Sequence, residues 1–210
     1  MLTIYGHPLS SPTNKVRMGA NAAGLEYDFV FIDLAEGEQK SEKYLAINPV
    51  GQVPAIDDDG FTLFESNAIN KYFARKAQSG LYPNNHRGQA LVDQWTDFVT
   101  NLVGAGYTRL LFNKIIAPQV GAPVNDNAIR EGEEMVSRAF PIVEKQLTRS
   151  PFLAGEELTL ADIALLATVD PSEVIEMDLA PHPKLNDWRE ALRKHEFYTR
   201  VHNYFGEGVL

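Results

Sequence analysis

The hydrophobic pattern of the chain changes once, and this change limits its fold more than any other feature. Up to about residue 78, short apolar runs typical of strands alternate with helical patterns. From about residue 86 onward, one amphipathic helical pattern follows another, with prolines between them. Glycine, proline and asparagine gather in residues 79–85, which is typical of a linker. The sequence therefore predicts two domains, 1–78 and 86–210, joined by the linker 79–85.

The first domain is predicted to be a small α/β unit. Its strands are expected at residues 2–5, 27–33, 53–56 and 61–64, and its helices at 14–23, from 41 to about 48, and from 66 to 77. A strand–helix–strand start favours a parallel pair, and Asp57-Asp58-Asp59-Gly60 is a hairpin signal that adds antiparallel strands. We expect these three aspartates to form a solvated turn. The result is one mixed four-stranded sheet with helices over it.

The second domain is predicted to be all helical. Helical patterns lie near residues 86–114, 126–148, 160–169 and 184–194, and a shorter one near 196–203. Thr159 and Asp162 have the spacing of a capping pair before the third of these helices, and we expect both to be structural.

The absence of cysteine excludes several kinds of site. Among the 210 residues there is none, so disulfides, thiolate metal sites and cysteine nucleophiles are ruled out. Any thiol chemistry needs a ligand that brings the sulfur. The five histidines show no metal-ligand spacing, so no metal is expected.

The net charge and the apolar pattern limit the partners. A formal net charge of -9 disfavours nucleic acid and anionic membrane surfaces. The longest apolar stretch, residues 163–169, is too short to span a bilayer. The N-terminus lacks the basic and apolar regions of a secretory signal, so the cytoplasm is the expected compartment.

Four segments, in this order along the chain, resemble the cytosolic glutathione transferases, and in particular the serine-type phi, theta and delta classes and their bacterial relatives. They are YGHPLSSP (5–12), NPVGQVPAI (48–56), FESNAI (64–69), and FLAG with TLADIA (152–155 and 159–164). The resemblance covers nearly the whole chain. It implies a thioredoxin-like N-terminal domain that binds glutathione, an all-helical C-terminal domain, and a homodimer.

Ser10 is the catalytic residue that the resemblance implies. In the family this serine hydrogen-bonds the sulfur of glutathione as a donor. A hydrogen bond to a charged group contributes roughly 1.5–3 kcal/mol, which would lower the thiol pKa by roughly 1–2 units. From the residues alone, a plain helix cap is the other interpretation of Ser10 or Ser11. Since neighbouring residues of an extended loop point in opposite directions, we expect only one of the two to face the sulfur.

The resemblance also implies the residues that bind glutathione. Val53-Pro54 is expected to be cis, with the Val53 backbone pairing with the cysteinyl part of glutathione. Gln52 would contact the backbone or the glycyl end of the ligand. Glu65 and Ser66 would bind the γ-glutamyl end at a helix start, where a plain cap is the alternative.

Four further positions are assigned by the same resemblance. Gln39 and Lys40 would hold the glycyl carboxylate, with a solvated loop as an equal alternative. Tyr107 and Asn113 lie in the region that lines the electrophile pocket in the family, although a core or surface position is the favoured interpretation of each residue taken alone.

Four positions depart from the family pattern, and one of them is Gln39, which replaces the more usual histidine. Asn14 and Lys15 stand where phi-like sequences often carry two arginines, and Val50 replaces an aromatic residue that docks on the dimer partner.

The expected function is conjugation of the glutathione thiolate to a small hydrophobic electrophile, with a hydroperoxide as a second class of acceptor. Glutathione is the co-substrate, and no cofactor is needed. The alternative is a glutathione-binding, ligand-binding or scaffold protein without turnover, because a fold does not fix a function.

Overall fold

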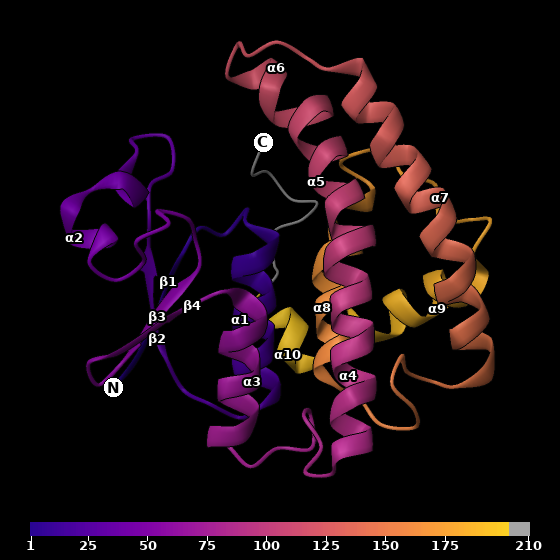
Figure 1. The fold of residues 1–210 in the computed structure, drawn as a ribbon, viewed down its shortest axis with the longest axis horizontal. Coiled ribbons are helices and arrows are strands. Elements are labelled where there is room, and N and C mark those ends of the chain that lie inside the picture. Colours follow the sequence, from indigo (N-terminus) through magenta and orange to yellow (C-terminus); the bar gives the residue numbers. More distant parts are fainter. Residues whose placement is uncertain (202–210) are drawn as a thin grey trace.

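The computed structural model describes residues 1–201, and its N-terminal half contains one four-stranded sheet (Figure 1). Its strands are β1 (Leu2–Gly6), β2 (Asp28–Phe31), β3 (Ala55–Asp58) and β4 (Phe61–Phe64), in the spatial order β2-β1-β3-β4. β1 pairs parallel with β2 and antiparallel with β3, which pairs antiparallel with β4. The predicted mixed sheet is confirmed.

Helices cover both faces of this sheet. The helical segments of the N-terminal half are α1 (Ser11–Ala22), η1 (Glu38–Lys40), α2 (Glu42–Leu45) and α3 (Ser66–Lys76). α1 and α3 lie between the sheet and the helical half, whereas α2 lies on the outer side (Figure 1). The inner face buries Ile4 and Ile56 of the sheet against Val16 and Phe73. Tyr44 of α2 packs with Ala55 on the other face.

The turn between β3 and β4 differs from the expected solvated run of aspartates. Asp59 and Gly60 alone form the turn, both with positive φ (53° and 88°), as a two-residue hairpin loop requires. Asp58 belongs to β3 and is buried. Its carboxylate accepts a hydrogen bond from the Tyr72 hydroxyl at 2.5 Å and forms an ion pair with Lys76, both on α3. The expectation for Asp58 was wrong because strand pairing turns this residue toward α3.

The loop from β1 to α1 is tightly packed. A Cβ on Gly6 would lie 2.3 Å from Cγ2 of Thr13, so this position excludes a side chain. α1 starts at Ser11, earlier than the expected residue 14, because Ser10 caps it and Pro12 fits its first turn. The hydroxyl of Ser10 accepts a hydrogen bond from the Thr13 amide at 3.3 Å.

The C-terminal half is helical throughout its main elements, as predicted. They are α4 (His86–Phe98), η2 (Val99–Gly104), α5 (Ala105–Leu111), η3 (Phe112–Ile116), α6 (Ala117–Gln119), α7 (Asp126–Arg149), α8 (Leu160–Val169), η4 (Asp170–Ser172), α9 (Pro183–Leu192) and α10 (Glu196–Thr199). The segments α4 to α6 follow one another without a break, and η2 and η3 are π-helical. The helix expected near 196–203 and the domain end at residue 210 extend outside the described residues.

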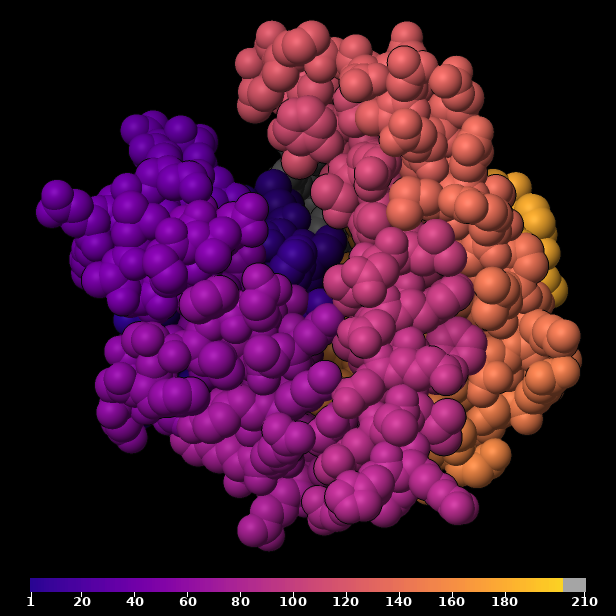
Figure 2. Space-filling view, in the orientation of Figure 1, coloured from indigo at the N-terminus to yellow at the C-terminus, as the bar shows by residue number. Residues whose placement is uncertain are grey.

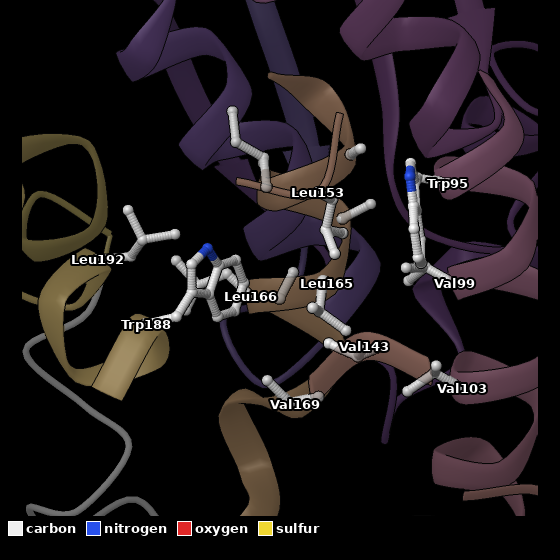
Figure 3. Packing of buried hydrophobic residues seen from close by; sticks show 14 of the residues in the cluster. Trp95, Val99, Val103, Val143, Leu153, Leu165, Leu166, Val169, Trp188 and Leu192 are labelled. Atoms are coloured by element: carbon white, nitrogen blue, oxygen red, sulfur yellow. The ribbon is translucent and has the colours of Figure 1, made fainter. Parts of the chain in front are cut away.

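α8 is the centre of the helical core. Leu165 and Leu166 of α8 lie between Trp95 of α4 on one side and Trp188 of α9 on the other (Figure 3). The Asp162 carboxylate accepts hydrogen bonds from the Thr159 amide (3.0 Å) and hydroxyl (3.0 Å). It also accepts one from the Leu153 amide at 2.9 Å. The structural role predicted for Thr159 and Asp162 is confirmed.

α1 and α3 belong to both halves of the molecule. Met18 and Ala74 are buried in the helical core, although they come from the N-terminal half. The Asn21 side chain also donates to the Phe197 carbonyl at 3.2 Å. The expected boundaries at residues 78 and 86 fall at the segment between α3 and α4, and the division into two folding units stays a prediction. Within residues 1–201, no helix is long and apolar enough to cross a membrane.

Candidate functional site

A cavity of about 1170 Å³ opens between the two halves. Figure 2 shows the molecule hollowed there, between the N-terminal half and the segments α5 and α6. On one side the wall comes from the β1–α1 loop, the loop before β3 and the start of α3. On the other side it comes from η2 to α6 and from the end of α8. Sequence segments that were predicted separately therefore share one site.

Ser10 and Ser11 both line the cavity, at the N-terminus of α1. Ser10 is the residue just before the helix, and its oxygen already accepts the hydrogen bond from Thr13. A hydroxyl has one donor and two acceptor positions, so the Ser10 O–H can still donate to a ligand. The cap and the catalytic interpretations of Ser10 are thus compatible. Ser11 begins the helix instead of extending the loop, and which of the two serines faces the sulfur stays a prediction.

Val53 lies in the cavity wall with its polar backbone free to pair. The Val53-Pro54 peptide bond is cis, as the resemblance implied. Within the described chain, neither the N–H nor the C=O of Val53 forms a backbone hydrogen bond. The adjacent Gln52 carbonyl accepts hydrogen bonds from the Tyr44 hydroxyl (2.7 Å) and the Asn48 side chain (2.6 Å). These bonds fix the loop before β3, while the Gln52 side chain stays exposed at the cavity.

Glu65 and Ser66 enter the cavity at the start of α3. Glu65 has φ 70° and ψ 107°, a backbone conformation that residues other than glycine rarely adopt. Such a residue costs about 1–3 kcal/mol and often marks a functional position. Ser66 is the first residue of the helix, so its hydroxyl and the following free amides point to where an anion is favoured.

Gln39 and Lys40 differ in their relation to the cavity. Gln39 lines it, and its side-chain oxygen is buried with no hydrogen-bond partner in the described chain. The Lys40 ammonium donates to the Val50 carbonyl at 3.3 Å and is not part of the wall. A Cβ at Gly51, where φ is +64°, would lie 2.8 Å from Nζ of Lys40. Gly51 thus lets the lysine cross this loop closely.

The structure brings Tyr107 to the cavity but not Asn113. The Tyr107 hydroxyl is buried and shares a 2.7 Å hydrogen bond with Ser172, and burial raises its pKa. The Asn113 side chain donates to the Arg109 carbonyl (2.8 Å) and accepts from the Asn125 amide (2.9 Å). It therefore holds the loop before α7. The helical pattern alone could not tell which face of this helix is turned to the cavity.

The wall of the helical half is mainly apolar. Leu111, Phe112, Ile115 and Ile116 line the cavity there, and Phe112 is 45% exposed. Leu9 of the β1–α1 loop also reaches the cavity. An apolar wall facing the Ser10 hydroxyl suits a hydrophobic second substrate.

Lys15 is a cavity residue to which the sequence assigned no role. It lies about one turn into α1 and is half-buried, and its ammonium donates to the Asn67 side chain at 2.7 Å. The only signal in the sequence was its place among the departures from the family pattern. The partner Asn67 is 52 residues away, and periodicity does not indicate such a pair.

The comparisons with known proteins agree on one family. The N-terminal domain of glutathione S-transferases matches residues 1–75, and the C-terminal domain matches residues 107–196. Glutathione S-transferase F10 of Arabidopsis thaliana is 33% identical over 169 residues, covering 79% of this chain and 78% of its own. Glutathione S-transferase 3 of Zea mays is 32% identical over 197 residues, covering 91% and 88%.

Solved structures show the same likeness over nearly the full length. The structure of a glutathione S-transferase I bound to lactoylglutathione has a TM-score of 0.87 and 30% identity, covering 95% of this chain and 97% of that one. The maize enzyme I in complex with an atrazine glutathione conjugate also has a TM-score of 0.87 and 30% identity, covering 95% of each chain.

Proposed function

Since this chain belongs to the glutathione S-transferase family, we propose that it transfers the thiolate of glutathione to small hydrophobic electrophiles. The observation that carries this proposal is the single cavity in which Ser10, Val53 and Ser66 face an apolar helical wall. A thiol ligand bound on the polar side would meet an apolar acceptor on the other. The alternative of a binding or scaffold protein without turnover is not favoured. Glutathione is the co-substrate, and the family needs no cofactor.

Ser10 activates the sulfur in this proposal. Its hydroxyl donates to the thiolate while its oxygen keeps the hydrogen bond from Thr13. The N-terminus of α1 adds a favourable field for the negative sulfur. Together with the approach of two substrates in one cavity, a thiolate formed before the reaction lowers the barrier.

The remaining polar groups hold the rest of glutathione. The free backbone N–H and C=O of Val53 would pair with the cysteinyl part as an added strand, with Gln52 beside it. Glu65 would meet the γ-glutamyl ammonium, and Ser66 with the start of α3 would meet its carboxylate. Gln39, whose side-chain N–H can donate, and Lys40 would face the glycyl carboxylate.

The electrophile would lie against the apolar wall, with Tyr107 in its floor. The Tyr107 hydroxyl is already bonded to Ser172, so this residue shapes the pocket and does not act on the sulfur. Asn113, bonded away from the cavity, has no support in the geometry for the role expected from the sequence. A homodimer and the cytoplasm stay predictions that rest on the family resemblance and the sequence.

Retention on glutathione-agarose, followed by conjugation of a generic aryl halide, tests the function. We expect the protein to bind, to elute with free glutathione and to catalyse conjugation. A cumene hydroperoxide assay tests the second class of acceptor. Retention without turnover of either acceptor would favour the binding protein, and no retention would contradict the proposal.

A further inference from the structure

Lys15 ends a chain of hydrogen bonds that crosses the cavity wall. Its ammonium donates to Oδ1 of Asn67 at 2.7 Å, and the Asn67 amide group donates to the Thr100 hydroxyl at 3.0 Å. Thr100 in turn donates to the Thr96 carbonyl at 2.8 Å. These hydrogen bonds connect α1 and α3 to the helical half and hold the Lys15 ammonium beside the start of α3.

The ammonium is partly desolvated, and no carboxylate of the described residues forms an ion pair with it. Burial lowers the pKa of Lys15 to about 8, and the nearby Glu65 carboxylate only partly offsets this effect. Within residues 1–201, Lys15 forms no ion pair, although three other lysine side chains do. A cation withdrawn from water is costly unless an opposite charge approaches it. Two of its three N–H donors remain after the bond to Asn67.

The charges around the start of α3 match one part of glutathione. The γ-glutamyl end carries one ammonium and one carboxylate. Glu65 supplies the negative charge that the ammonium needs, and Ser66 supplies a neutral donor for the carboxylate. Without Lys15, the occupied subsite would hold one unbalanced negative charge. With Lys15 it holds two of each sign.

We propose that Lys15 binds the α-carboxylate of the γ-glutamyl residue of glutathione, an inference that rests on the proposed function. The flexible stem of Lys15 lets the ammonium keep its bond to Asn67 while a second N–H turns toward the ligand. Ser66 and Lys15 then hold the carboxylate from two helices, α3 and α1. The sulfur, held by Ser10, is at the other end of the γ-glutamylcysteine unit.

The test compares glutathione with 4-aminobutyryl-cysteinyl-glycine, which lacks only this carboxylate. Dissociation constants are measured by calorimetry at pH 6.5, where Lys15 is protonated, for the wild type and for Lys15→Met. In the wild type, we expect the analogue to bind about 10-fold or more weakly than glutathione. In Lys15→Met, glutathione should bind about 10-fold more weakly than to the wild type. The ratio between the two ligands should fall by about the same factor, because the group that senses the carboxylate is missing.

Three controls separate the proposal from a loss of structure. Lys145→Met, at an exposed lysine of α7, should leave both constants unchanged. Lys15→Arg should restore most of the discrimination, because it restores the charge. Lys15→Gln, which can still bond Asn67, serves if Lys15→Met does not fold, and it should also lose the discrimination.

An unchanged ratio between the two ligands in a folded Lys15→Met or Lys15→Gln protein would overturn the proposal, even if both ligands bind more weakly. Such a result would mean that Lys15 only supports Asn67. Failure of the proposed function looks different, because the wild type would then bind no glutathione at all.

Discussion

Ser10 and Ser11 both reach the cavity, but only Ser10 stands before the first turn of α1. We expect Ser10→Ala to raise the pKa of bound glutathione by about 1–2 units, since it removes the donor to the sulfur. It should also cost about 1 kcal/mol of stability through the lost cap. Ser11→Ala should change neither quantity appreciably. Thiolate absorbance of bound glutathione against pH gives the pKa, and urea denaturation gives the stability.

The opposite pattern, in which Ser11→Ala changes the pKa of bound glutathione and Ser10→Ala does not, would assign the hydrogen bond to the sulfur to Ser11. If neither substitution moves it, a backbone amide at the start of α1 or another side chain is the donor. Measuring both the thiol pKa and the stability of the two variants therefore tests separately whether Ser10 caps the helix and whether its hydroxyl activates the sulfur.

Ser66 should act on affinity more than on turnover. In the proposed binding mode, its place at the start of α3 puts it at the γ-glutamyl end, away from the sulfur. Ser66→Ala should raise the KM for glutathione by about 5- to 10-fold and leave kcat within about 2-fold, since a neutral hydrogen bond contributes about 1 kcal/mol. Steady-state kinetics with glutathione varied at saturating electrophile measure both. A fall in kcat at constant KM would assign Ser66 to the chemical step.

At the scale of elements, Asp58 joins the hairpin of β3 and β4 to α3. The bonds from Lys76 and Tyr72 lower the pKa of the Asp58 carboxyl. A carboxyl whose folded pKa lies below its unfolded value of about 3.9 stabilises the fold above that pH and loses this effect as the pH falls. Asp58→Asn should therefore reduce the free energy of unfolding by about 1–2 kcal/mol at pH 7.

The difference in the free energy of unfolding between Asp58→Asn and the wild type should disappear only below about pH 4, where the wild-type carboxyl becomes protonated as well. Urea denaturation at several pH values measures it. Asp28→Asn, on the exposed edge strand β2, is the matched control and should have little effect at any pH. A difference in the free energy of unfolding that stays constant down to pH 3 would show that Asp58 stabilises the fold through packing and not through its charge.

Most elements could be predicted from the sequence because each depends on local chemistry. The period-2 and helical patterns gave the strands and helices, and Thr159 with Asp162 marked the start of α8. What could not be predicted depends on contacts between distant residues. Asp58 is turned toward Lys76 and Tyr72 by the register of β3, and Lys15 meets Asn67 only once α1 and α3 pack together. The same limit explains why Tyr107 faces the cavity and Asn113 does not.

At the scale of the whole molecule, we expect a homodimer. The prediction rests on the family, and several large apolar side chains are exposed on the single chain, Val50 (47%), Phe61 (49%) and Leu91 (44%) among them. Light scattering at micromolar concentration should give about twice the chain mass of 23.4 kDa. A mass of one chain would contradict the prediction. The small side chain of Val50, in place of the aromatic residue of many relatives, makes this measurement informative.

α1 takes part in both halves, since Val16 packs under the sheet while Met18 is buried in the core around α8. This sets a condition on chimaeras built from two relatives. A crossover between α3 and α4 looks natural because it separates the polar wall of the cavity from the apolar one. It would also pack Met18 and Ala74 against side chains from the other relative. The helical half must therefore come from a relative whose core side chains leave space of the same size and shape for these two residues. New acceptor preferences are therefore easier to graft by exchanging side chains on α5 and η3 than by swapping the whole helical half.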